Sequence, residues 1–203
     1  MKKIGLALVL ALTVVMVCAQ DISKKVHAVV EKYHKEHPEL GISVGFIHQN
    51  QEYYIAYGNL SRTSEVAINK NSVFDIASIT KVITGNLVAQ AAQQGKLSLD
   101  VYMDGYLPKG IQLQPQLQQK IKISDLASHQ SGLPDLDFPA LIAKNPQQPV
   151  SSVTKESIIS LINNTDTLLD YGKYRYSTVG YTLLGLVLEK IYAKSYDKIV
   201  AEK

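Results

Sequence analysis

Two short runs rich in β-branched and aromatic residues, 42–47 and 52–57, carry the strand signal of this 203-residue chain. The four polar residues between them predict a hairpin turn. Helical periodicity marks five further segments: 21–36 before the hairpin, then 78–94, 124–128, 154–163 and 178–193. A single hairpin among helices predicts an α+β fold, and we find no repeat and no linker between domains.

The composition excludes several classes of protein. Lys and Arg number 21 and Asp and Glu 18, a net charge of +3, whereas nucleic-acid binding requires a clustered basic face. Apolar residues make up 46% of the chain, which argues against intrinsic disorder. The single cysteine excludes a disulfide framework and a cysteine-based zinc site.

Residues 1–19 have the order of a secretory signal peptide. Two lysines are followed by an uncharged apolar stretch, 4–17, and cleavage is expected after Ala19. A membrane anchor is the alternative, but the stretch is shorter than the roughly 20 residues that a span requires. Cys18 is an alternative lipidation site. We therefore expect one domain, 20–203, in a periplasmic or secreted protein.

Serine followed three residues later by lysine occurs at three places: Ser78/Lys81, Ser152/Lys155 and Ser195/Lys198. Ser152 lies in a polar segment before a helix, where N-capping is the expected role. Ser195 is expected on a solvated face near the end of the chain. Only Ser78 stands where a short extended run, 73–77, leads into a helix expected to bury an apolar stripe: Val82, Ile83, Leu87, Val88 and Ala91.

The position of Ser78 suits a nucleophile. Backbone N–H groups at a helix N-terminus can hold the oxyanion that forms when the hydroxyl attacks a carbonyl. Lys81 is one turn further along, so its amine can reach the Ser78 hydroxyl, and in an apolar site it could act as a base. The alternative is that Ser78 caps the helix while Lys81 points to solvent.

Tyr176 is the second candidate, because it lies where a loop becomes the apolar helix 178–193. A tyrosine there can present its hydroxyl to a cleft, where a neighbouring lysine would lower its pKa. The alternative is an aromatic ring that packs at a corner.

Four ordered segments resemble the penicillin-recognising serine hydrolases, and most closely the class C β-lactamase, D-alanyl-D-alanine peptidase and esterase group. They are Phe-Asp-Ile-Ala-Ser-Ile-Thr-Lys at 74–81, Gly-Lys-Leu-Ser-Leu-Asp at 95–100, the His-Gln-Ser-Gly-Leu-Pro segment within 123–134, and Tyr-Ser-Thr with its helix at 174–185. The resemblance implies a β-lactamase/transpeptidase-like fold, with a helical lobe and an antiparallel sheet that is incomplete here.

The resemblance also implies roles for single residues. Ser78 would be the acylated nucleophile, Lys81 its proton acceptor or relay, and Tyr176 a shared base that then protonates the leaving group. Thr178 would contact substrate, although the family usually has Asn there. His129 and Ser131 would have structural roles. The resemblance implies no metal ion and no cofactor.

Two other departures from the family bear on function. The family normally has Pro-Gly where this chain has Tyr171-Gly172, and its third motif, Lys or His followed by Thr or Ser and Gly, is found nowhere in this sequence. We therefore expect a truncated hydrolase that acts on an amide, lactam or ester of a small molecule or peptide. The alternative is a non-catalytic relic or a module that binds cell-wall peptide or a protein.

Overall fold

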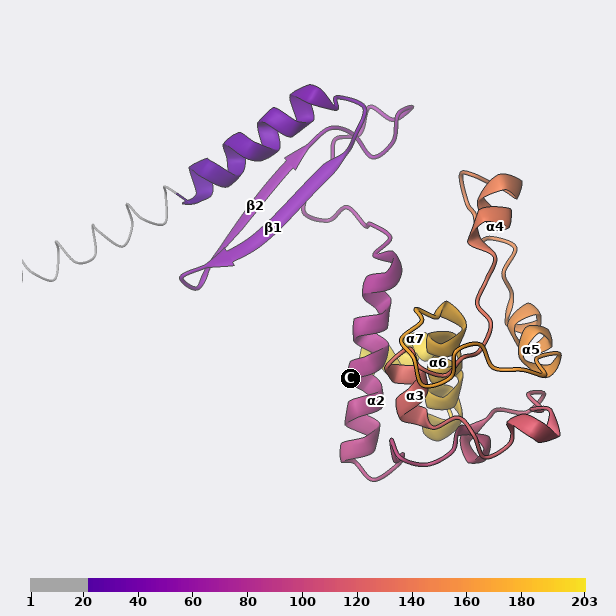
Figure 1. The fold of residues 1–203 in the computed structure, drawn as a ribbon. Helices are drawn as coiled ribbons and strands as arrows, with labels where there is room; N and C mark the ends of the chain where they lie inside the picture. The colour runs from indigo at the N-terminus through magenta and orange to yellow at the C-terminus, as the bar shows by residue number, and fades with distance from the viewer. Residues whose placement is uncertain (1–21) are drawn as a thin grey trace, which may run out of the picture. The chain divides into compact units, whose positions relative to one another are not determined.

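The computed structural model describes residues 22–203, so the expected signal peptide and Cys18 lie outside the described residues. The chain divides into two compact units, one ending at Asp75 and the other running from Ile76 to Lys203 (Figure 1). Helices together with a two-stranded antiparallel sheet confirm the predicted α+β class. Within residues 22–203 no helix is both long enough and apolar enough to cross a membrane.

The first unit contains a helix over 22–36 and a hairpin of β1 (Ile42–His48) and β2 (Gln51–Tyr57). The strands pair in a register that leaves Gln49 and Asn50 between them. These two residues have φ values of 50° and 60°, the left-handed backbone of a tight hairpin turn. The predicted hairpin is confirmed, with a turn shorter than the polar segment suggested.

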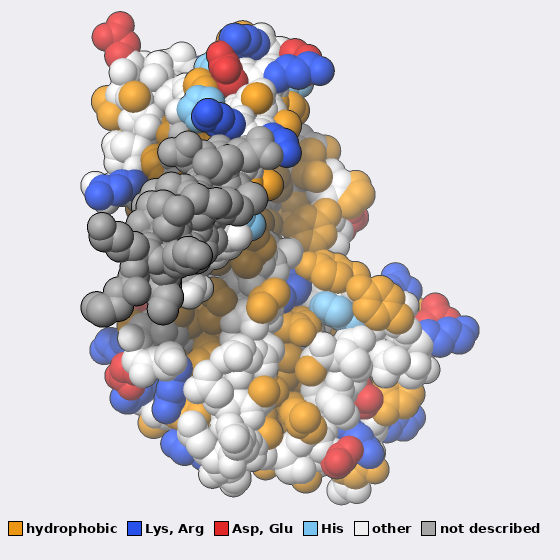
Figure 2. All heavy atoms as spheres, turned by 90° about the vertical axis from the view of Figure 1, so that its left-hand side faces the viewer, with side chains coloured by type: hydrophobic (Ala, Val, Ile, Leu, Met, Phe, Trp, Pro, Cys, Tyr) orange, Lys and Arg blue, Asp and Glu red, His pale blue; other side chains and the backbone are white. Residues whose placement is uncertain are grey.

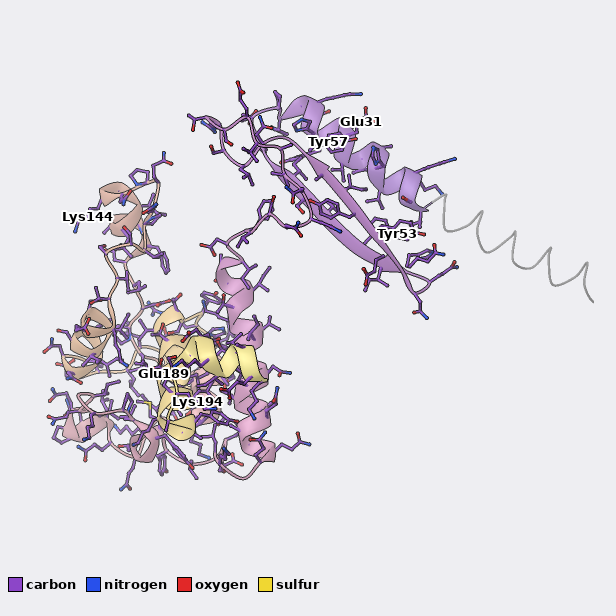
Figure 3. All side chains as sticks on the ribbon, turned by 180° about the vertical axis from the view of Figure 1, so that it is seen from behind. Glu31, Tyr53, Tyr57, Lys144, Glu189 and Lys194 are labelled. Carbon is purple, nitrogen blue, oxygen red and sulfur yellow. The ribbon has the colours of Figure 1, made fainter. Side chains whose placement is uncertain are left out.

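Tyr57 joins the hairpin to the helix of this unit. Its hydroxyl lies 2.7 Å from Nε2 of His27, and its ring stacks on that of His34 at 5.3 Å. Figure 3 shows the labelled Tyr57 side chain between β2 and the helix. At the end of β2, Gly58 has φ +78°, where an added Cβ would lie 2.5 Å from the Leu40 carbonyl oxygen.

The second unit is built of helices, 3₁₀ turns and loops. It opens with the 3₁₀ turn η1 (Ala77–Ile79), which leads directly into α2 (Thr80–Gln93). The other elements follow in the order η2 (Met103–Tyr106), η3 (Pro115–Leu117), α3 (Ile123–Ala127), α4 (Phe138–Lys144), α5 (Lys155–Asn163), α6 (Thr178–Tyr192) and α7 (Tyr196–Glu202).

Helix α6 is the centre of the hydrophobic core of this unit. Leu183, Leu184 and Leu188 are completely buried on it, and α2, α3 and α7 pack against it (Figure 1). The loop between α2 and α3 adds the buried Met103 and Ile121 to the same core. This packing brings the N-terminal ends of α2 and α6 together, which positions the candidate site.

Several sequence predictions about this unit were wrong. Val82 is 72% exposed. Hydrophobic side chains also reach the surface at several places in the space-filling view (Figure 2). Thr84 is buried on α2 instead, together with the expected Leu87, Val88 and Ala91. The N-cap of α5 is Thr154, whose hydroxyl accepts from the Ser157 amide, and not Ser152. The sequence pattern missed α4 and α7, because both are short and α7 buries only Ile199.

Candidate active site

Ser78 lies in the 3₁₀ turn at the N-terminal end of α2, as the sequence predicted. The residue before it, Ala77, has φ +43°. Left-handed backbone at a residue other than glycine costs about 1–3 kcal/mol and is concentrated at functional sites. The strained Ala77 therefore introduces the turn that presents the Ser78 side chain, in a position where helix amides and the helix dipole favour negative charge.

Three of the predicted site residues form one hydrogen-bonded group. The Lys81 ammonium donates to Ser78 Oγ at 3.2 Å, and the Tyr176 hydroxyl donates to the same oxygen at 2.8 Å. The Lys81 side chain thus reaches back over one turn of helix. Tyr176 lies two residues before the start of α6. Ser78 Oγ lies between a cation and a phenol, which is an arrangement that can move a proton.

The electrostatic surroundings increase the fraction of Tyr176 that is present as phenolate, the form that can accept a proton. Hydrogen bonding from Lys81, followed by that from Ser78, lowers the pKa of Tyr176, while burial and the Asp135 charge oppose this shift. The Lys81 ammonium also lies 4.9 Å from the centre of the Tyr176 ring. Because Lys81 acts on both partners, it favours the phenolate beside the serine hydroxyl.

Thr178 opens α6 and lines a cavity of about 410 Å³ next to this group. Residues of α2 and α6 line most of the cavity, among them Lys81 and Glu189, and Tyr196 of α7 also lines it. Figure 3 labels Glu189 on α6. Its carboxylate is held by Lys155 at 3.3 Å and by the Tyr196 amide at 3.0 Å, so its charge is compensated.

The loop 129–135 holds the segment that carries Tyr176. His129 Nδ1 accepts from the Ser177 amide at 3.1 Å, and the Asp135 carboxylate accepts from the amides of Thr178 and Val179. Ser131 is buried and its hydroxyl accepts from the Leu133 amide. Sequence reasoning named His129 and Ser131 as structural residues but missed Asp135, because nothing near Asp135 in the sequence points to a partner more than forty residues away.

Tyr171, which stands where the resemblance leads us to expect proline, is held by two hydrogen bonds. Its hydroxyl donates to the Lys120 carbonyl at 2.8 Å and to the Asp125 carboxylate at 2.9 Å. Burial and Asp125 raise the pKa of Tyr171 to about 12. The side chain thus fastens the loop before Tyr176 through hydrogen bonds, where proline would restrict the backbone.

The other two Ser-x-x-Lys pairs are not built as reactive sites. Lys155 pairs with Glu189 and not with Ser152. Ser195 and Lys198 are exposed, and Ser195 hydrogen-bonds Asp197, as the sequence pattern suggested for a solvated face. Among residues 22–203 no group of three or more His, Cys, Asp or Glu side chains could hold a metal ion.

Comparison with known proteins finds relatives with several different descriptions. An N-acetylmuramyl-L-alanine amidase of Bacillus subtilis (strain 168) is 34% identical over 134 residues, which cover 62% of this chain and 29% of the relative. A beta-lactamase of Providencia stuartii is 26% identical over 189 residues, which cover 93% of this chain and 45% of the relative. The chain therefore spans less than half the length of these relatives.

The fold is also similar to that of solved structures. The crystal structure of a class C beta-lactamase from Rhodobacter sphaeroides superposes with a TM-score of 0.67 at 24% identity, covering 86% of this chain and 46% of that one. A model of the family described as Beta-lactamase matches residues 26–203, which cover the second unit and most of the described part of the first. The chain belongs to the beta-lactamase family.

Proposed function

We propose that this chain carries the acylation site of a serine hydrolase, in which Ser78 attacks the carbonyl of an amide, lactam or ester. The observation that carries the proposal is the pair of hydrogen bonds to Ser78 Oγ, from Lys81 at 3.2 Å and from Tyr176 at 2.8 Å. A nucleophile with a base in hydrogen-bond reach, and a cation to tune that base, is the arrangement that covalent catalysis requires.

In the first step the Tyr176 phenolate takes the proton of the Ser78 hydroxyl while Oγ bonds to the carbonyl carbon. The oxyanion that results is stabilised at the N-terminal end of α2. When the tetrahedral intermediate collapses, the bond to the leaving nitrogen or oxygen breaks, and Tyr176 returns the proton to that atom. Water then attacks the carbonyl carbon of the acyl-Ser78 ester and gives a proton to Tyr176. The bond between that carbon and Ser78 Oγ breaks, the acid product is released, and Tyr176 returns the proton to Oγ.

A small-molecule or peptide substrate would lie in the cavity beside Thr178, because Lys81 and Thr178 both line it and Lys81 donates to Ser78 Oγ. Threonine offers one hydroxyl where asparagine offers an amide that donates and accepts. Contacts with a substrate amide at this position are therefore fewer than with asparagine. The names of the relatives, an amidase and a beta-lactamase, fit the reaction class.

The proposal includes a periplasmic or secreted location. It rests on the signal-like order of residues 1–19, which ends in small residues before Asp21. N-terminal sequencing of the protein from its natural source tests it, and cleavage after Ala19 is the expected result.

Covalent labelling tests the reaction. The protein is incubated with a fluorescent penicillin and, separately, with an activated ester, and its intact mass is measured. We expect one adduct on Ser78 and none in Ser78→Ala. Ser195→Ala is the matched control, because it removes the serine of an exposed Ser-x-x-Lys pair and should label like the unaltered protein.

Equal labelling of Ser78→Ala would refute the site. No labelling of the unaltered protein would contradict an acylation site that works in this chain and would favour the alternative, a non-catalytic module that binds peptide. The same cavity would then be tested by titration with cell-wall peptides followed by calorimetry.

A further inference from the structure

The backbone on both sides of Tyr176 is held almost entirely from one loop, 129–135. The Arg175 amide donates to the His129 carbonyl at 2.7 Å, and the Ser177 amide donates to His129 Nδ1 at 3.1 Å. Asp135 accepts from the Thr178 amide at 2.9 and 3.0 Å and from the Val179 amide at 3.1 Å. Tyr176 therefore sits between two attachment points of a single loop.

The geometry requires His129 to be neutral. An imidazole nitrogen that accepts the Ser177 N–H carries no proton, and imidazolium has no acceptor at all. Burial and the Lys81 charge lower the pKa of His129, and only Asp135 opposes this shift. The ring also contacts three tyrosine rings, with centroid distances of 4.6 Å to Tyr176, 4.9 Å to Tyr181 and 5.7 Å to Tyr174.

The loop itself is fixed in place. Its Gly132 has φ +68°, and an added Cβ would lie 2.9 Å from the Leu169 carbonyl oxygen. The Gly132 carbonyl accepts from the Leu169 amide at 2.7 Å, and the Gln130 carbonyl accepts from the Gly172 amide at 3.0 Å. The carboxylate of Asp135 lies at the N-terminus of α6, where the helix dipole stabilises it. Because the loop 129–135 is held in one conformation, its hydrogen bonds can fix the position of the segment that carries Tyr176.

We infer that His129 and Asp135 are positioning residues for Tyr176, which hold its hydroxyl against Ser78 and Lys81, and that protonation of His129 releases this hold. The geometry stands on its own, while its effect on acylation rests on the proposed function. The family resemblance implied a general structural role for His129 and Ser131, and this inference assigns a defined role to His129 and to Asp135.

The sign of the pH effect follows from the groups that face His129. These are Lys81 from α2, Asp135 from the same loop, and the hydroxyl-bearing Tyr174, Tyr176 and Tyr181 from the segment that leads into and forms α6. As the pH falls through the pKa of His129, the Ser177 amide loses its acceptor and the new cation repels Lys81. Tyr176 is therefore held above that pKa and released below it.

Two pairs of variants distinguish a role in positioning Tyr176 from a general role in folding. In His129→Asn the side-chain oxygen can replace Nδ1 as acceptor, asparagine tolerates the left-handed backbone of this position (φ +60°), and the residue cannot titrate. His129→Ala removes the acceptor. Asp135→Asn keeps one acceptor oxygen without the charge, and Asp135→Ala removes both.

The first measurement does not depend on catalysis. Tyrosine labelled with ¹³C at Cζ reports each phenol pKa by NMR, and the Tyr176 resonance is assigned with Tyr176→Phe. We expect a pKa below the usual value in the unaltered protein and in His129→Asn, and a return toward about 10 in His129→Ala, because Tyr176 moves away from Lys81. The Asp135 charge itself raises the pKa of Tyr176, so Asp135→Ala is compared with Asp135→Asn, which lacks the same charge, and should show the higher Tyr176 pKa of the two. Equal Tyr176 pKa values within both pairs of variants would overturn the inference.

The second measurement is the rate of Ser78 acylation against pH. A displacement of the base by about 1 Å can cost on the order of 100-fold in rate, so we expect such losses in the two alanine variants. His129→Asn should stay within about threefold at pH 8. Loss of the Tyr176 phenolate lowers the rate toward acid pH in both proteins, and protonation of His129 should make that fall steeper in the unaltered protein alone. An equally steep fall in His129→Asn would overturn the pH part.

The two proposals fail in different ways. If no form of the protein is acylated, the proposed function fails, and the NMR titration still decides whether the loop positions Tyr176. If an alanine variant does not fold, the amide resonance of Ser177 tests whether protonation of His129 breaks its hydrogen bond to that amide. The resonance should shift with pH below about 6.5 in the unaltered protein and stay constant in His129→Asn. Equal shifts in both proteins would refute the inference.

Discussion

The Tyr176 hydroxyl lies 2.8 Å from Ser78 Oγ, although 98 positions separate the two residues in the chain. The contact forms because α2 and α6 pack side by side in one core and their N-terminal ends meet. A local pattern places Ser78 and Lys81 together, but the packing of two helices brings the tyrosine to them. The candidate site is thus a product of the helical core.

Tyr176→Phe should slow acylation of Ser78 by about 10²- to 10⁴-fold, the usual contribution of a general base. The ring that contacts His129 and Lys81 remains, so the melting temperature should be almost unchanged. The rate is measured by intact mass after timed exposure to an activated ester. Tyr174→Phe is the control, because Tyr174 is 70% exposed and should leave the rate unaltered. A Tyr176→Phe protein that reacts at the normal rate would remove Tyr176 from the mechanism.

Lys81→Met should shift the midpoint of the alkaline limb of the pH–rate profile to higher pH. Lys81 is the largest cause that lowers the pKa of Tyr176, so its loss returns that pKa toward 10.0. The phenolate is the reactive form, and the rate should therefore rise with pH to a higher midpoint than in the unaltered protein. The measurement is the acylation rate between pH 6 and 10.5. Lys198→Met, from the exposed Ser-x-x-Lys pair, should leave the midpoint in place.

The parts of this structure that local sequence determines were the parts that could be predicted. The hairpin, the helices α2, α3, α5 and α6, and the Ser78–Lys81 pair all depend on spacing within a few residues. The role of Asp135 could not be predicted, because its hydrogen bonds to the start of α6 form only in the folded chain. Local spacing could not predict the hydrogen bond of Tyr176 to Ser78 either, and only the family resemblance linked the two residues. Val82 was misplaced because, at 3.6 residues per turn, it points away from the face of α2 that buries Leu87, Val88 and Ala91.

Tyr196→Phe should lower the free energy of unfolding by about 1 kcal/mol, the net contribution of one buried hydrogen bond. The Tyr196 hydroxyl lies 2.7 Å from Thr84 Oγ1, which joins α7 to the buried face of α2. Urea unfolding at pH 7 measures the loss. Tyr192→Phe is the matched control, since its hydroxyl bonds the exposed Gln94 at 3.2 Å and should contribute little. Equal losses in both variants would show that the Thr84 contact is not special.

Tyr171 should make the stability of the protein fall between about pH 10 and pH 12. Burial and the Asp125 carboxylate raise its pKa to about 12, because the protonated hydroxyl donates to Asp125 and to the Lys120 carbonyl in the folded state. An unfolded tyrosine titrates near 10, so the contribution is complete below pH 10 and is lost as the pH rises through 12. Urea unfolding at pH 9, 10.5 and 12 gives the free energies to compare.

The informative quantity is the difference between the unaltered protein and Tyr171→Phe, because other tyrosines and lysines titrate over the same range in both. That difference should be largest at pH 9 and should shrink toward pH 12, as the hydroxyl that the variant lacks becomes a phenolate that can no longer donate to Asp125. Tyr174→Phe, which removes an exposed hydroxyl, should show no such convergence. A Tyr171→Phe difference that is independent of pH would mean that the hydroxyl does not fasten the loop before Tyr176.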